Sequence, residues 1–247
     1  MQYRASFVML TFGHFLVTGI EFIGILVLFD RFGSLQGWTL PEVALFYGLI
    51  NLAFSLTDAV SRGFDDMGNL VKQGAFDRLL LHPRSTVLQL IGKALTLRRI
   101  GRFFQRAIVL AWAVMNLDID WTVLKVLLAA FKVLCGACFF LGLFVILGTL
   151  TFWMTETLEI MSALTYGGIE TSKYPLSIYR AWFRKFFTMV VPMGSATYFH
   201  VAILERTDPL GTSVNFQWFV PISDLIFFIL TLQLWQIGVQ HYRSTGS

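Results

Sequence analysis

Residues 133–155 contain no charged side chain, and this run constrains the fold more than any other feature of the sequence. A helix needs about 20 apolar residues to cross the roughly 30 Å hydrocarbon core of a bilayer. Similar apolar stretches cover residues 5–29, 43–60 and 218–240. Only 14% of the 247 residues are charged, whereas about 25% is usual for a soluble domain. The sequence therefore predicts an all-α integral membrane protein with a single transmembrane domain, residues 1–247.

A fourth predicted span runs over residues 126–153, but the third span is short of apolar residues. Residues 107–117 alone would give a helix of about 16 Å, so this helix must begin near Arg98 and carry Arg102 and Arg106 to the membrane surface. These three arginines are spaced by four and form one stripe that can reach lipid phosphates. The preceding segment, residues 86–99, is expected to lie in the interface as an amphipathic helix.

Lysine and arginine are unevenly distributed along the chain, and this distribution predicts the orientation. Residues 61–106 hold nine of the nineteen basic residues, whereas the loops at residues 30–42 and 116–120 are neutral to acidic. Cytoplasmic loops carry the excess of basic residues in membrane proteins. We therefore expect residues 61–106 in the cytoplasm, six spans, both termini cytoplasmic and a multi-pass protein of the cell (inner or plasma) membrane. Because the basic residues cluster between spans, we expect membrane lipids as partners and no nucleic acid.

Residues 154–206 allow two arrangements. In the first, residues 155–171 form a short and rather polar fifth span, followed by an external hairpin that dips into the membrane. In the second, residues 154–185 stay in the cytoplasm and residues 186–204 form the span. The positive-inside rule favours the second arrangement, because it keeps the basic segment YRAWFRKFF inside.

Acidic residues inside the predicted spans are candidates for function, because a buried carboxylate is costly in a membrane unless it is paired or faces water. Glu21 lies deep in the first span, seven residues after His14 and on the same helix face. Two interpretations stay open: these side chains line a transport pathway or couple protons, or they form a structural hydrogen bond. Asp58 and Asp224 lie nearer span ends, where interfacial positions are expected, and Asp58 is a further pathway candidate.

Sequence motifs for chemistry are missing from the chain. There is no G-x-x-x-x-G-K-[ST] phosphate loop, no H-E-x-x-H and no G-x-S-x-G. Cys135 and Cys138 lie inside the charge-free run, where cysteines at i and i+3 pack as small apolar residues. Because a structural zinc site usually needs four ligands, we expect no metal site, no cofactor in this chain and no enzymatic activity of the chain alone.

A polar segment at residues 68–85 interrupts this apolar chain with the sequence GNLVKQGAFDRLLLHPRS. It predicts a short amphipathic helix with Phe76, Leu79 and Leu80 on its apolar face. Gly74 can open the helix and Pro83 can end it. Such a helix either rests on lipid, with its basic residues on phosphates, or docks into a soluble partner.

The string GAFDRLLLHP within this segment resembles the G-x-F-D-x-L-L-x-x-P signature that follows the second span in one bacterial branch of type-2 ATP-binding-cassette (ABC) exporter permeases. The resemblance extends in order over most of the chain. It is carried further by QYRASF, GWTLPEVALFYG, TFWMTE and YPLSIYRAWFRKFFTMVVPMGSATYF.

The resemblance implies a fold of six spans with a cytoplasmic coupling helix and a membrane-dipping external segment at residues 174–206 before the last span. It implies two partner ATPase subunits that bind ATP and Mg²⁺, and a second permease, sibling or identical, that forms a dimer for export. The implied ATPase-coupling residues are Gly74, Phe76, Asp77, Leu79, Leu80, Pro83 and Arg84. The implied outer-gate residues are Tyr174, Pro175, Pro192, Tyr198 and His200.

The chain departs from its resemblance in two places, and two other functions stay open. Relatives usually begin with an amphipathic helix ahead of the first span, whereas this chain starts almost at Tyr3, and His200 stands where relatives often have proline. The alternatives are a self-standing secondary transporter or channel that uses Glu21 and His14, and a lipid-modifying membrane enzyme. Glu156 and Glu159 would serve that enzyme, but no histidine or metal-ligand set accompanies them.

Overall fold

The computed structural model describes residues 3–35, 37–93, 100–154, 158–175, 178–189 and 214–242. These residues are almost entirely helical, apart from one isolated bridge between Leu35 and Trp38. The long helices are α1 (Tyr3–Phe32), α2 (Leu40–Asp58), α7 (Ile100–Asn116), α8 (Val123–Leu150), α9 (Leu158–Ser172) and α12 (Val214–His241). The short helices are α3 (Arg62–Asp65), α4 (Met67–Lys72), α5 (Ala75–Leu80), α6 (Thr86–Gly92) and α10 (Ala181–Met189).

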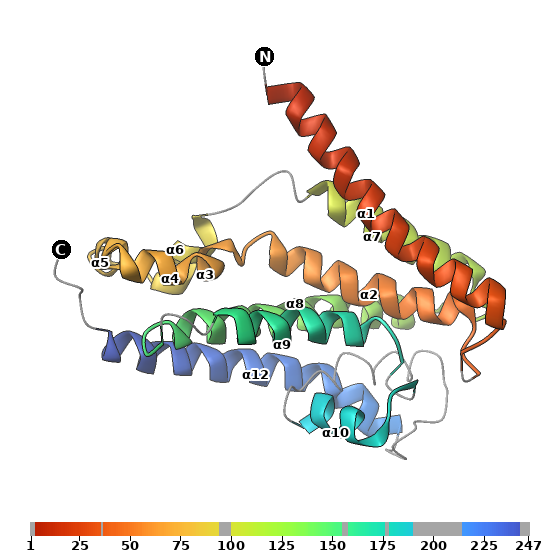
Figure 1. The fold of residues 1–247 in the computed structure, drawn as a ribbon. Coiled ribbons are helices and arrows are strands. Elements are labelled where there is room, and N and C mark those ends of the chain that lie inside the picture. Colours follow the sequence, from red (N-terminus) through yellow and green to blue (C-terminus); the bar gives the residue numbers. More distant parts are fainter. Residues whose placement is uncertain are drawn as a thin grey trace.

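The long helices form a bundle with distinct ends. Figure 1 shows α2, α8, α9 and α12 running along one another, with α1 inclined to them and α7 alongside α1. α8 packs most extensively against α12, and α2 packs against α7, α8 and α9. The short helices α3 to α6 gather at one end, where α12 also ends, and α10 lies at the other end. We call the end formed by α3 to α6 the coupling end.

Three of the described helices are long and apolar enough to cross a membrane: α2, α8 and residues Pro221–His241 of α12. α7 contains a shorter apolar stretch, Phe103–Asn116. This confirms an all-α membrane protein with several crossings. α7 begins at Ile100, two residues after the start that the sequence required near Arg98, which lies outside the described residues.

The start of α2 is set by capping residues at and just after Thr39. Thr39 precedes the helix, and the Glu42 carboxylate accepts hydrogen bonds from the Thr39 backbone N–H at 2.7 Å and from its hydroxyl at 2.8 Å. Pro41 stands in the first turn, where its missing N–H costs nothing. This reciprocal cap stabilises the helix start and positions the residues that follow.

α9 covers part of residues 154–206, for which the sequence allowed two arrangements. It packs against α2 and α8, and it starts near the coupling end and stops short of the end where α1 and α2 meet (Figure 1). This path is compatible with the arrangement in which residues 155–171 form a short fifth span. α9 is not among the described helices that are long and apolar enough to cross a membrane, so the fifth span stays a prediction. Residues 190–213, which include much of the predicted external segment, lie outside the described residues.

Candidate functional site

Phe76 anchors the coupling end to the long helices. Gly74 has φ of 62°, a left-handed conformation that suits glycine, and α5 starts directly after it. The Phe76 side chain is 0% exposed. Its ring centroid lies 5.2 Å from that of Phe152 and 5.0 Å from that of Tyr242, at the ends of α8 and α12.

The burial of Phe76 bears on the predicted role of α5 as a docking helix. An apolar face at helical spacing was expected to dock into a partner, but Phe76 is already covered by its own chain and cannot touch a partner without unpacking. Leu79 is half-buried, and Leu80 is 42% exposed. Leu81, the residue that follows α5, is 84% exposed.

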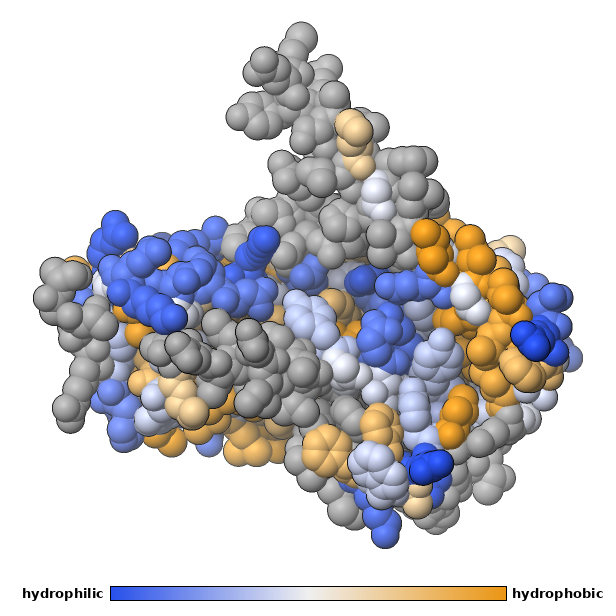
Figure 2. All heavy atoms as spheres, in the orientation of Figure 1, coloured by the Kyte–Doolittle hydropathy of each residue, from blue (hydrophilic) through white to orange (hydrophobic). Residues whose placement is uncertain are grey.

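The exposed surface of the coupling end therefore differs from the predicted one. Arg78, Leu81, His82, Pro83 and Arg84 are exposed, and hydrophilic residues dominate this end of the molecule in Figure 2. We call these five residues the tip.

Hydrogen bonds and close contacts hold the tip in a fixed shape. The Gln89 amide donates to the backbone oxygens of Leu79 at 3.0 Å and Arg84 at 2.9 Å. The Trp235 indole donates to the Thr86 hydroxyl at 2.9 Å and so joins α12 to α6. A Cβ at Gly63 would lie 2.3 Å from the Leu90 carbonyl oxygen, so only glycine lets α3 approach α6 this closely. These contacts join the coupling end to the end of α12.

Asp77 is half-buried within this block and lies near Tyr242. Burial, and next the Asp77 carboxylate, raises the pKa of Tyr242 to about 12. The phenol is therefore neutral under physiological conditions. Asp77 therefore lies on the side of α5 that faces the end of α12, and its role in docking a partner stays a prediction.

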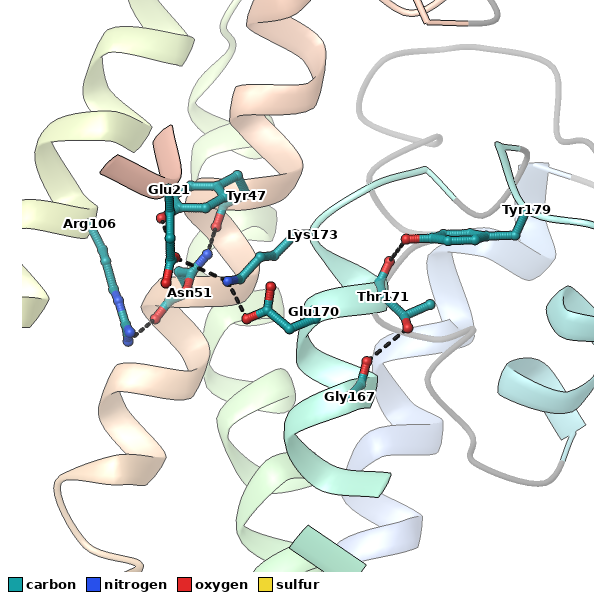
Figure 3. A network of polar contacts seen from close by, with 9 residues as sticks. All are labelled: Glu21, Tyr47, Asn51, Arg106, Gly167, Glu170, Thr171, Lys173 and Tyr179. Carbon is teal, nitrogen blue, oxygen red and sulfur yellow. Dashed lines mark hydrogen bonds and ion pairs between the residues drawn. The ribbon is translucent and has the colours of Figure 1, made fainter. Parts of the chain in front are cut away.

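A second set of polar residues lies within the helix bundle, shown in Figure 3. The Lys173 ammonium contacts the Glu21 carboxylate of α1 at 3.2 Å and the Glu170 carboxylate of α9 at 2.5 Å. The Tyr47 hydroxyl of α2 donates to Glu21 at 3.2 Å. We call Glu21, Tyr47, Glu170 and Lys173 the open cluster, because the Glu21 side chain is 44% and the Glu170 side chain 64% exposed.

The open cluster lies deep in the predicted membrane region. Glu21 precedes Asp30 by nine residues, which corresponds to about 14 Å along a helix. If Asp30 lies at the membrane surface, this depth is near the middle of a hydrocarbon core of roughly 30 Å. Charged side chains at such a depth face water, a partner chain or one another rather than lipid.

Arg106 extends the polar surface along α2. Its guanidinium donates to the backbone oxygen of Asn51 at 3.0 Å and to the Ser55 hydroxyl. Tyr47, Asn51 and Ser55 are four residues apart and share one face of α2. Arg106 is therefore turned toward α2 and not toward lipid phosphates. The Arg102 side chain lies outside the described part of the chain, as does Arg98, so their lipid contacts stay a prediction.

The comparisons with known proteins can now be set beside this geometry. The family model described as ABC-2 family transporter protein matches residues 15–246. The chain belongs to the ABC-2 transporter family. No curated protein and no solved structure matches it.

Membership of the ABC-2 family confirms the coarser predictions from sequence. The chain is a transmembrane permease of an ABC transporter and a multi-pass membrane protein. Permeases of this family associate with ATPase subunits and carry no ATPase site of their own. The assignment of the GAFDRLLLHP motif to one branch of the family stays a prediction.

The remaining residues predicted for this ABC-2 permease fall into three groups. Tyr174 packs beside buried apolar side chains of α1 and α2, and Pro175 follows it with a buried side chain. Asp58 is 9% exposed at the end of α2. Outside the described residues, or with undescribed side chains, are His14, Glu156, Glu159, Pro192, Tyr198 and His200.

Sequence reasoning missed Lys173, Glu170 and the Lys132–Asp224 pair. Lys132 on α8 donates to the Asp224 carboxylate on α12 at 2.7 Å, and the two side chains are 4% and 1% exposed. Asp224 was expected near the interface, but the partner from α8 allows it to be buried. The Glu170–Lys173 spacing of three was a usable signal on a helix, whereas nothing local connects Lys132 with Asp224.

Proposed function

We propose that this chain is the permease subunit of an ABC exporter with six membrane crossings, and that the tip docks into a separate ATPase subunit. The observation that carries the proposal is the rigid link from the exposed tip through Phe76 to the ends of α8 and α12. The exposed leucine and basic side chains of the tip suit an apolar pocket with an acidic rim. The partner ATPase would bind ATP and Mg²⁺.

The packing around Phe76 supplies a route for mechanical coupling. When two ATPase subunits close on ATP, each tip is displaced as a rigid body. The Phe76 ring packs against the rings of Phe152 and Trp235, with centroid distances of 5.2 Å and 6.3 Å. A displacement of the tip would therefore move the ends of α8 and α12 together. The buried pair of Lys132 and Asp224 keeps these two helices from sliding apart. The expected response is a joint tilt of α8 and α12.

The open cluster is proposed to line the transport pathway. Its carboxylates need water or polar groups at mid-membrane depth, and a pathway between two permeases would provide both. A second permease, identical or a sibling, would face α1 and α9 and close the other side of this pathway. Tyr174 and Pro175 follow α9 directly, and they would contribute to an outer gate. The coupling end and both termini would lie in the cytoplasm, and the complex in the cell membrane.

The first experiment is a pull-down of the tagged chain from its native membrane in mild detergent, with subunits identified and counted by mass spectrometry. Leu81→Asp is expected to abolish recovery of an ATP-binding subunit while the chain still inserts. Leu88→Asp is the matched control, because Leu88 is a leucine that is 65% exposed on α6 and is not one of the five tip residues. Recovery of the ATPase with Leu81→Asp at the wild-type level would refute docking through the tip.

The open cluster also favours a second candidate, a self-standing secondary transporter or channel that uses Glu21 together with His14. This candidate predicts transport by the purified chain in vesicles without any ATPase, driven by an ion gradient. The exporter proposal predicts no transport under those conditions. Absence of a copurified ATPase together with gradient-driven transport would decide for the second candidate.

A further inference from the structure

An apolar groove of about 450 Å³ lies between α2, α7 and α8, away from both sites described above. α2 contributes Leu45, Leu49, Leu52 and Leu56, which share one face of the helix. α7 and α8 supply the two other walls. The side chains that line the groove are apolar throughout, apart from the indole nitrogen of Trp121.

The groove opens sideways, toward the membrane. α2 and α8 are both long and apolar enough to cross a bilayer. On α8, Val126 is 52% and Leu134 is 59% exposed where they border the groove. The groove and its rim of exposed aliphatic side chains lie on a face that crosses the membrane. Lipid hydrocarbon is therefore expected to surround and fill the groove.

The length of the groove corresponds to one leaflet. Leu45 and Leu56 on α2 are eleven residues apart, and Phe103 and Val114 on α7 are also eleven residues apart. Each separation corresponds to about 16 Å of helix. One leaflet occupies about half of the 30 Å core, or about 15 Å. A single acyl chain running parallel to α2 and α7 therefore matches the groove in length.

Trp121 closes the groove at the end opposite the coupling end, just before α8 begins. Its indole N–H is buried, and among the described residues no acceptor lies within hydrogen-bonding distance. A buried donor without an acceptor is costly. The glycerol ester carbonyls of a phospholipid lie at the level where tryptophan residues gather in membrane proteins, and such a carbonyl would accept this hydrogen bond.

We propose that this groove is a binding site for one phospholipid acyl chain, with the Trp121 N–H donating to the ester carbonyl above it. The acyl chain would run from Trp121 along α2 and α7 toward the coupling end and hold α2, α7 and α8 together from outside. This site is separate from the transport pathway, because the exposed carboxylates of the open cluster lie on α1 and α9. A second permease on α1 and α9 would leave the groove facing lipid.

The test is titration of the delipidated full-length protein with palmitoyl-oleoyl phosphatidylglycerol, followed by native mass spectrometry. Ala130→Phe fills the groove and is expected to raise the Kd of the first bound lipid at least about tenfold, since burial of several methylene groups is lost. Leu127→Phe is the matched control on the same helix, at a residue that is 62% exposed and outside the groove. It is expected to leave the Kd within about twofold.

Trp121→Phe tests the hydrogen bond separately and keeps the ring. It is expected to raise the Kd about fivefold, the effect of one hydrogen bond. The proposal is overturned if Ala130→Phe and Leu127→Phe bind lipid equally well. It is also overturned if Leu134→Cys, with Cys135 and Cys138 replaced by alanine, forms disulfide-linked dimers in high yield in the membrane. That result would mean that a second copy covers the groove.

Discussion

Two lysine–carboxylate sites occupy the helix bundle, and they differ in exposure rather than in chemistry. Lys132 and Asp224 form a pair at 2.7 Å that is almost fully enclosed, with side chains 4% and 1% exposed. Lys173 is equally buried at 5%, but its partners Glu21 and Glu170 are 44% and 64% exposed. The enclosed pair joins α8 to α12 and offers no surface to a cargo. The open cluster presents two carboxylates to whatever lies outside α1 and α9.

The comparison teaches that burial of the acidic partner separates a structural ion pair from a candidate pathway. Both sites place charge where a bilayer does not tolerate it unpaired. In the enclosed pair the two opposite charges neutralise each other, and removing one leaves a buried charge without a counter-charge. In the open cluster water or a partner chain can solvate the carboxylates, so their loss should affect function more than folding.

Lys132→Met breaks the enclosed pair and should have the largest effect on stability. Asp224 would stay buried and unpaired, which typically costs about 3 kcal/mol or more of the free energy of unfolding. The unfolding midpoint of the purified protein in detergent measures this loss. The double variant Lys132→Met/Asp224→Leu is the control and should recover most of the midpoint. A single variant with an unchanged midpoint would contradict a structural role for the pair.

Lys173→Met tests the open cluster with the same substitution. The free energy of unfolding should fall by about 1 kcal/mol or less, because the carboxylates left behind are solvent-exposed. The shift of the unfolding midpoint should therefore be small. ATP-driven transport by the assembled complex in vesicles should fall about tenfold, a change of about 1.4 kcal/mol in the barrier. The charge-swapped variant Glu21→Lys/Lys173→Glu should regain part of that activity. Equal destabilisation by Lys132→Met and Lys173→Met would remove the distinction between the two sites.

Glu170→Gln should have the smallest effect and sharpens the comparison within the open cluster. Glu170 is its most exposed member, and Lys173 keeps Glu21 as a partner. The expected change in unfolding free energy is within about 0.5 kcal/mol, with transport reduced less than by Lys173→Met. Both readouts come from the same preparations. A loss of transport as deep as that of Lys173→Met, at unchanged stability, would instead identify Glu170 as a direct contact of the cargo.

Much of the helix layout was predictable, because hydropathy along the chain reports where a segment meets lipid. The span expected at residues 43–60 is α2, Leu40–Asp58, and that expected at residues 126–153 is α8, Val123–Leu150. α7 also begins close to the residue required by its length. The path of residues 158–175 was left open, because α9 is too polar for hydropathy to place and its packing against α2 and α8 is a tertiary contact.

The sites were less predictable than the helices. Phe76 was correctly placed on the apolar face of a short helix, but periodicity cannot tell whether a partner or the chain itself covers that face. The rings of Phe152, Trp235 and Tyr242 cover it, and all three come from the far half of the sequence. For the same reason Arg106 was expected at lipid phosphates, although its guanidinium bonds to α2.

The sequence by itself determined that this chain is helical and membrane-embedded, and that it carries a polar segment between its second and third long helices. These properties follow from local composition, because each helix satisfies its own backbone hydrogen bonds and needs only an apolar surface toward lipid. Only the tertiary structure decided which charges are enclosed and which are open. Lys132 and Asp224 are 92 residues apart in the chain, and Glu21 and Lys173 are 152 apart. Their pairing depends on how the helices pack, which no local pattern encodes.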